Sequence, residues 1–208
     1  LSCPKWDLSM LRSNLETLLA DQPLRGRIVE LHTLTADDYE ELAVTCLDPD
    51  VWRSTMAKIQ TREQLRDYLG QGLKQLAEGK AVPLLIRLAR DGAAAGSTRL
   101  AKTFDEDVLE IGWTFIAPAL HRAGVNAEAK LLLLDYAFDV MRCRRVVFKV
   151  AAGNDRSKAA LAKLGAVPLG AAQPSAHDQP VDWFHIDRDD WPERRRALEQ
   201  RVDIVSAN

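Results

Sequence analysis

The stretch that decides the fold is residues 108–165, VLEIGWTFIAPALHRAGVNAEAKLLLLDYAFDVMRCRRVVFKVAAGNDRSKAALAKLG. It opens with an apolar, β-rich segment at 108–116 that predicts a strand. A turn containing Gly124 follows, and the segment 126–141 after it is apolar on nearly all sides. Its narrow polar stripe consists of Glu128, Asp135, Asp139 and Arg142. A helix with so little polar surface is buried, and here we expect it to pack against a sheet.

The second half of the stretch repeats the pattern of strand followed by helix. The β-branched and aromatic residues of 145–151 predict a strand. Asn154 then suits the N-cap of a short helix, and Gly165 permits the left-handed conformation that ends one. The stretch therefore predicts strand, helix, strand, helix without interruption.

Further elements flank this unit on both sides. Upstream, the patterns predict a strand at 24–34, helices at 36–46 and 61–79, and strands at 82–90 and 97–104. Downstream, they predict a weak strand at 166–171, a strand at 181–187 and a helix from Asp189 to about Val202. This order of elements predicts one α/β (α+β) domain over residues 24–208.

Residues 1–23 are predicted to form a separate N-terminal extension. Their leucines recur at helical spacing, at Leu8, Leu11, Leu15, Leu18 and Leu19. We expect a short amphipathic helix there, docked either on the domain or on a partner.

Composition excludes several classes of protein. The chain has 208 residues, of which 47% are hydrophobic and 28% charged, as in ordinary globular domains. Its 28 basic and 30 acidic residues give a net charge of −2, so no nucleic-acid partner is expected. No apolar run reaches the length of a membrane span, and the N-terminus does not resemble a secretory signal.

The cysteines and histidines predict neither a disulfide framework nor a metal site. The three cysteines form no C-x-x-C pair, which favours reduced thiols in a cytoplasmic protein. The four histidines are scattered along the chain, so no metal is expected.

The turn at 121–126, His-Arg-Ala-Gly-Val-Asn, is a candidate anion site. Small residues at 123, 124 and 127 allow a ligand to approach the backbone. The first N–H groups of the following helix lack intrahelical partners and carry partial positive charge. Together these features favour phosphate groups, although a glycine before a helix is also compatible with an ordinary tight turn.

The sequence around this turn, from the strand before it to the helix that begins at 154, resembles that of the GNAT superfamily of acyl-CoA-dependent N-acyltransferases. The resemblance is in particular to its Rim-type branch, which acetylates ribosomal-protein N-termini and other amines. The most specific part is the N-x-x-S…L-x-K-L-G-A block at 154–166. The segments LRGR at 24–27, DPDVW at 48–52 and DWP at 190–192 extend the likeness over most of residues 24–192.

The resemblance implies a single-domain GNAT fold. Its centre is a mixed, mostly antiparallel twisted sheet of about seven strands flanked by helices, with acyl-CoA bound between splayed strands four and five. It also implies acetyl-CoA as co-substrate, with the turn at 122–127 as the pyrophosphate loop. His121 stands where Gln or Arg is usual in that loop, and Asn126 where a small residue is usual. The residues thereby assigned to the cofactor are Phe115, Ile116, His121, Arg122, Ala123, Gly124, Val125, Asn126, Ala127, Asn154 and Ser157.

Two residues are candidates for the chemistry. Glu110 is the best candidate base, because a carboxylate on a mostly buried strand is costly unless it is used or paired. Because side chains alternate between the two faces of a strand, Glu110 is expected on the same face as Gly112, Thr114 and Ile116. The opposite face is apolar and consists of Leu109, Ile111, Trp113 and Phe115. The resemblance places Ser157 beside the thioester sulfur, and residues 154–165 contain no tyrosine, which makes Ser157 the best available acid. A salt-bridged Glu110 and a merely structural Ser157 are the alternatives.

The predicted function is transfer of an acetyl group from acetyl-CoA to a primary amine, by direct attack through a tetrahedral intermediate. The acceptor is a protein N-terminus or a small-molecule amine, and the protein is a monomer or homodimer. Trp52, in a predicted loop, is a candidate acceptor contact that core packing explains equally. Trp183, on a late strand, is a second candidate, for which core packing is the preferred explanation. A non-catalytic acyl-CoA sensor or scaffold and an unrelated phosphate-binding protein remain as alternatives.

Overall fold

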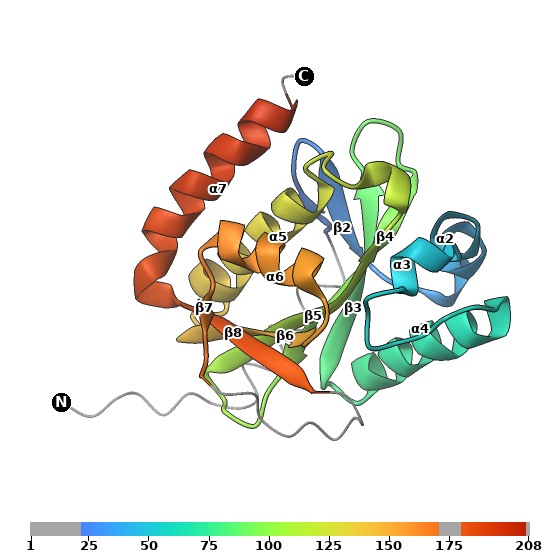
Figure 1. Cartoon of the computed structure of the whole chain (residues 1–208), viewed down its shortest axis with the longest axis horizontal. Helices are drawn as coiled ribbons and strands as arrows, with labels where there is room; N and C mark the ends of the chain where they lie inside the picture. The colour runs from blue at the N-terminus through green and yellow to red at the C-terminus, as the bar shows by residue number, and fades with distance from the viewer. Residues whose placement is uncertain (1–21, 171–179, 207–208) are drawn as a thin grey trace.

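The computed structural model describes residues 22–170 and 180–206, which form one mixed sheet with helices on both faces (Figure 1). The predicted extension at 1–23 lies almost wholly outside these residues. The strands are β1 (Leu24–Arg25), β2 (Val29–Thr33), β3 (Ala81–Leu88), β4 (Ala94–Lys102), β5 (Val108–Ile116), β6 (Arg145–Ala151), β7 (Val167–Pro168) and β8 (Val181–Asp187). Their order in the sheet is β1-β2-β3-β4-β5-β6-β8-β7.

The sheet confirms the predicted mixed, mostly antiparallel architecture but has eight strands among the described residues, not about seven. Among the strands that the structure describes, only β5 and β6 pair in parallel, and every other neighbouring pair is antiparallel. The extra strand arises because the predicted strand at 24–34 is split at Gly26. The Gly26 N–H donates to the Val29 carbonyl at 2.8 Å, which closes a turn between β1 and β2.

The helices form two layers (Figure 1). One layer contains α2 (Tyr39–Cys46), α3 (Pro49–Trp52) and α4 (Arg62–Ala77); the other contains α5 (Val125–Asp135), α6 (Asp155–Leu164) and α7 (Trp191–Ser206). Short 3-10 turns cover Ala36–Asp38, Pro118–Leu120 and Arg188–Asp190, and a π-turn at Tyr136–Val140 extends α5. Helix α3 replaces the loop predicted around Trp52, because Asp48 caps it and Pro49 occupies its first position.

Each face of the sheet carries its own hydrophobic core. The larger core packs α5, α6 and α7 against one face and includes Leu109, Ile111 and Leu133. The smaller core packs α2, α3 and α4 against the other face and includes Trp52 and Phe115. Because β5 contributes to both cores, its two faces look toward different helical layers.

A bulge in β5 changes the predicted assignment of its faces. Trp113 has a φ of 53°, and the pairing of β5 with β4 slips at this point. After the bulge Thr114 and Ile116 lie on the same face as Leu109 and Ile111, whereas Phe115 faces the α4 layer with Glu110. The predicted grouping of Glu110 with Thr114 and Ile116 is therefore wrong, since strict alternation fails across an inserted residue.

The same region opens a gap in the sheet. Strands β5 and β6 pair only over Val108–Glu110 and Arg145–Val147, and they diverge beyond. The divergence leaves one edge of the second half of β5 without a neighbouring strand, while β4 still covers the other edge.

Glu128, one residue of the polar stripe predicted for the buried helix, is itself buried and makes hydrogen bonds within the protein. The Glu128 carboxylate accepts hydrogen bonds from the backbone N–H groups of Arg27, Ile28 and Val29 at 2.6–2.9 Å. A Cβ at Gly26 would collide with this carboxylate, which explains glycine at that turn. These bonds tie the start of α5 to the β1–β2 turn and fix the position of the helix N-terminus.

Candidate functional site

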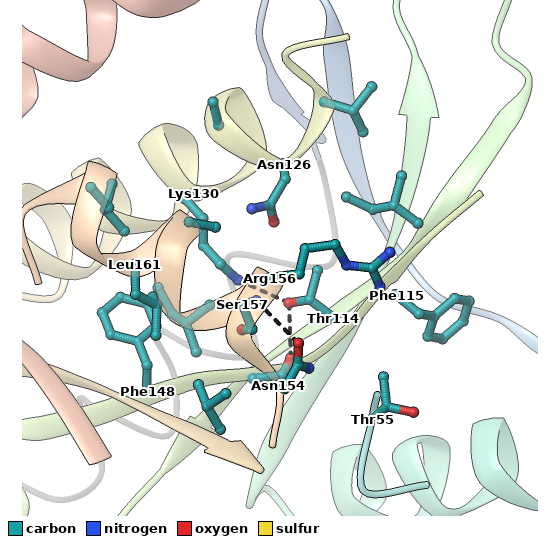
Figure 2. A pocket seen from close by; sticks show the side chains of 18 of the residues that line it. Thr55, Thr114, Phe115, Asn126, Lys130, Phe148, Asn154, Arg156, Ser157 and Leu161 are labelled. Atoms are coloured by element: carbon teal, nitrogen blue, oxygen red, sulfur yellow. Dashed lines mark hydrogen bonds between the residues drawn. The ribbon is translucent and has the colours of Figure 1, made fainter. Parts of the chain in front are cut away.

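A cavity of about 940 Å³ opens where β5 and β6 diverge, and helices of both layers border it (Figure 2). Twelve of the predicted site residues line it: Trp52, Glu110, Phe115, Ile116, His121, Arg122, Gly124, Val125, Asn126, Ala127, Asn154 and Ser157. Ala123 and Trp183 do not line it. The fold thus brings most of the predicted site together from four separate segments of the chain.

The N-terminus of α5 faces this cavity without a side-chain cap from the described residues. The first intrahelical bond runs from the Glu128 N–H to the Gly124 carbonyl, so the N–H groups of Val125, Asn126 and Ala127 precede it. Uncapped N–H groups at the positive end of a helix dipole are suited to an anion.

Gly124 lines the cavity, but a side chain at this position would point into the neighbouring packing. Its φ of 78° is left-handed, and a Cβ would lie 2.6 Å from Ile28 Cδ1 and 3.1 Å from Val205 Cγ1. A side chain at this position would therefore press on the packing of α5 and α7. Ala127, in the first turn of α5, is half-buried and lines the cavity. A substitution at Ala127 therefore tests ligand binding more directly than a substitution at Gly124 does.

Asn154 and Ser157 begin the opposite wall of the cavity. The Asn154 side-chain oxygen accepts a hydrogen bond from the Ser157 N–H at 3.1 Å, so Asn154 caps α6 as predicted. This bond leaves the Asn154 amide nitrogen and the Ser157 hydroxyl on the cavity side of the helix (Figure 2). Capping and ligand contact are therefore compatible at Asn154.

Arg156 reaches from α6 toward the turn before α5. Its guanidinium lies 3.4 Å from Nδ1 of His121, and both residues line the cavity. Burial and, next, the Arg156 charge lower the pKa of His121, which favours the neutral imidazole. Arg122 and Arg156 thus place positive charge near the uncapped helix end.

Glu110 is 8% exposed and lies at the last paired position of β5 before the strands diverge. Burial raises the pKa of its carboxyl, and the Lys149 ammonium opposes this shift. A carboxylate with a raised pKa is a stronger base, and its place on the cavity wall gives it access to a reacting group.

An aromatic wall covers the cavity on the same side of the sheet as Glu110. Phe115 packs between Trp52 and Tyr68, with ring centroids at 4.8 and 6.1 Å. The Trp52 indole N–H donates to the Cys46 carbonyl at 2.8 Å, so Trp52 both anchors the core and lines the cavity. Burial raises the pKa of the Tyr68 phenol to about 12, against the smaller effect of Arg99.

Trp183 lies next to the cavity lining rather than in it. It pairs with Lys149 across β8 and β6, and the Lys149 ammonium lies 5.5 Å from its ring centroid and 5.7 Å from that of Trp113. Trp183 therefore holds Lys149 in place and contacts the site indirectly.

Sequence reasoning missed Tyr68 and Lys130, both of which line the cavity. Lys130 comes from the second turn of α5 and is 7% exposed. Its ammonium donates to the Thr114 hydroxyl at 2.8 Å, and burial lowers its pKa to about 7. A signal existed in the sequence, because Lys130 interrupts an apolar run with Asn126 and Leu134 four residues away rather than an acidic partner.

Neither a membrane span nor a metal cluster is found in residues 22–170 and 180–206. None of the helices there combines the length and hydropathy needed to cross a bilayer. No three His, Cys, Asp or Glu side chains within those ranges gather in a way that could hold a metal ion.

Comparison with known families identifies the class of protein. A family model described as an acetyltransferase (GNAT) domain matches residues 29–167, more than half of the chain. This chain therefore belongs to the GNAT acetyltransferase family and is an acyltransferase. Members of the family generally use acetyl-CoA and act on amine acceptors.

Solved structures agree with the family match. One protein described as a candidate acetyltransferase is 30% identical and has a TM-score of 0.75, with 88% of this chain and 95% of that chain covered. Another, from T. thermophilus, is 29% identical with a TM-score of 0.74, covering 88% and 97%. A proposed ribosomal-protein-serine acetyltransferase from Vibrio cholerae, at 15% identity and a TM-score of 0.68 over 81% and 99%, shows a shared fold alone.

Proposed function

We propose that this chain transfers the acetyl group of acetyl-CoA to a primary amine, either a protein N-terminus or a small-molecule amine, by direct attack on the thioester. The observation that carries the proposal is the meeting, in one cavity, of an uncapped helix N-terminus, a gap between diverging strands and a buried carboxylate. The helix N-terminus would bind the phosphates, the gap between the strands would align the thioester, and the carboxylate would accept a proton.

The residues around the cavity fit acetyl-CoA. The N–H groups of Val125, Asn126 and Ala127 would hold the diphosphate, aided by Arg122 and the positive end of the helix dipole. The edge of β5 at Phe115 and Ile116 would pair with the amide groups of the pantetheine arm, because no strand covers it there. Asn154 would hydrogen-bond that arm from α6 with the amide nitrogen that capping leaves free.

Glu110 would accept the proton that the amine must lose. An alkyl amine is mostly protonated at neutral pH, so a base or a water held by one is required. Backbone N–H groups near the bulge at Trp113 would donate to the carbonyl oxygen as it gains negative charge. Ser157 would donate a hydrogen bond toward the sulfur from the first turn of α6.

The acceptor would approach from the aromatic side of the cavity. Trp52, Tyr68 and Phe115 form this wall on the face of the sheet that Glu110 occupies. An amine held against them would have its nitrogen near the carboxylate, which is the direction of attack that the gap in the sheet permits.

A charge variant with a matched control tests the cofactor site. Ala127→Glu would place a carboxylate beside the proposed phosphates, while Ala127→Gln has nearly the same size without charge. Both glutamate and glutamine are good helix formers, so the fold should tolerate either. In titration calorimetry, Ala127→Glu should weaken acetyl-CoA binding at least about tenfold relative to Ala127→Gln. Equal affinities would place the phosphates elsewhere.

Turnover is tested by release of free thiol from acetyl-CoA in the presence of a panel of amines that includes peptides with free N-termini, polyamines and aminoglycosides. We expect at least one amine to be acetylated. Tight binding of acetyl-CoA without turnover of any amine would instead favour an acyl-CoA sensor or scaffold, and absence of binding would reject both functions.

A further inference from the structure

Lys130 is a buried cation that the proposed reaction does not yet use. Its side chain enters the cavity from α5 and ends at Thr114, whose hydroxyl lies 2.8 Å from that of Thr98 (Figure 2). No carboxylate of the described residues pairs with the ammonium, and burial alone accounts for its lowered pKa. An unpaired buried ammonium is costly, and a structural role does not require one because a methionine could fill the same space.

Lys130 and Glu110 approach the cavity from opposite faces of the sheet. Leu109 and Ile111 belong to the core beneath α5, so Glu110 between them projects toward the α4 layer. Lys130 belongs to α5 itself and contacts Thr114 on the α5 face. The two groups can reach a common point only where β5 and β6 diverge, which is where the thioester is proposed to lie.

We propose that Lys130 protonates the thiolate of CoA as it departs, on the face of the sheet opposite to the one from which the amine attacks. This inference rests on the proposed function and adds a residue to it. Ser157 contributes a hydrogen bond to the sulfur, whereas Lys130 is the source of the proton.

The proton balance closes with these two residues. Glu110 first takes the extra proton of the alkylammonium and passes it to water, which leaves a neutral amine. The amine nitrogen then forms a bond to the carbonyl carbon and gives a second proton to Glu110, and the carbon–sulfur bond breaks with its electron pair moving to sulfur. The Lys130 ammonium gives a proton to that sulfur and becomes neutral. Glu110 then releases its proton to water and Lys130 takes one up, so the enzyme returns to its starting state.

The surroundings of Lys130 suit this role. Among the described residues, the ammonium contacts the Thr114 hydroxyl from β5 and lies 6.0 Å from the centroid of the Phe148 ring from β6. Neither can take the proton. Because a thiol has a pKa near 8.5, an ammonium with a pKa of about 7 donates to a thiolate downhill.

The test compares Lys130→Met with the exposed-lysine control Lys74→Met on α4. The first readout is ligand binding: wild type should bind CoA about tenfold more tightly than desulfo-CoA, since the ammonium faces the sulfur. Lys130→Met should lose this preference, and Lys74→Met should keep it. Equal binding of CoA and desulfo-CoA by the wild type would overturn the proposal without any need for the variant to fold.

The second readout is catalysis with two acetyl donors. Lys130→Met should lower kcat with acetyl-CoA by roughly 10–10²-fold, and should lower it much less with an aryl thioester, whose thiolate leaves unprotonated. An unchanged kcat, or equal losses with both donors, would overturn the role of Lys130 while leaving acetyl transfer by the wild type intact. Absence of turnover by the wild type with every amine would instead reject the proposed function itself.

Discussion

Lys130→Met should stabilise the folded protein at neutral and acidic pH, and this gain should vanish at alkaline pH. The substitution removes a buried ammonium whose partner is a hydroxyl, and it keeps a side chain of similar length in the space between α5 and β5. A mutation at the centre of a site that increases stability is unusual, because most core substitutions destabilise.

The size of the effect follows from the lysine's surroundings. Burial lowers the pKa of Lys130 from 10.5 to about 7. At about 1.36 kcal/mol per pKa unit, keeping the ammonium charged costs the folded state roughly 5 kcal/mol. Losing the hydrogen bond to Thr114 offsets about 1 kcal/mol of this. The expected gain in the free energy of unfolding is therefore on the order of 4 kcal/mol where Lys130 is charged.

The pH dependence has a definite sign. Below about pH 7 Lys130 is protonated in both the folded and the unfolded wild type, so the full penalty is present. Between about pH 7 and about pH 10.4 the unfolded chain binds a proton that the folded chain does not, and wild-type stability rises with pH. Above this window the penalty is gone, and the wild type and Lys130→Met should be about equally stable.

Urea unfolding followed by tryptophan fluorescence measures the difference, at about pH 6 and, above the window, at about pH 11. Lys74→Met controls for the loss of an ordinary exposed lysine and should match the wild type at both values. A gain of equal size at both values, or a loss of stability at pH 6, would refute the reasoning that Lys130 is a buried group with a strongly lowered pKa.

Three further predictions concern neighbouring residues. Glu110→Gln should lower kcat by roughly 10²–10⁴-fold with little change in acetyl-CoA affinity, measured by steady-state kinetics and calorimetry; an unchanged kcat would leave Glu110 a structural role. Ser157→Ala should lower kcat about tenfold without shifting the melting temperature, since Asn154 caps α6 through the Ser157 backbone; a large shift would mean that the hydroxyl holds the helix. Gly26→Ala should destabilise the protein by about 1–3 kcal/mol in urea unfolding, because its Cβ meets the Glu128 carboxylate; an unchanged midpoint would show that the turn adjusts freely.

Periodicity and caps predicted most of the secondary structure because those signals are local. Thr61 begins α4 with a capping box, and Asn154 and Gly165 bracket α6 as expected. The family resemblance added what local signals lack, namely a mixed, mostly antiparallel sheet and the gap between two of its strands. The predicted cofactor residues from the turn before α5 line the cavity, apart from Ala123.

The features that sequence reasoning missed depend on contacts between distant segments. The bulge at Trp113 reverses the faces of β5, and nothing in a tryptophan marks a left-handed φ. Lys130 interrupts an apolar run, but the sequence alone does not show that its ammonium enters the cavity, which depends on how α5 packs on the sheet. Tyr68 joins the cavity from a helix 45 residues before Trp113, through a hydrogen bond from its hydroxyl to the Trp113 carbonyl.

The most direct test of the proposed function follows the acetyl group itself. The purified chain is incubated with acetyl-CoA carrying an isotopically labelled acetyl group and with the amine panel, and the products are analysed by mass spectrometry. We expect the labelled acetyl group on the nitrogen of a primary amine, in amounts equal to the CoA released, and no label on the protein during turnover. CoA release without labelled amide, or label accumulating on the protein as an obligatory intermediate, would contradict direct transfer from acetyl-CoA to an amine.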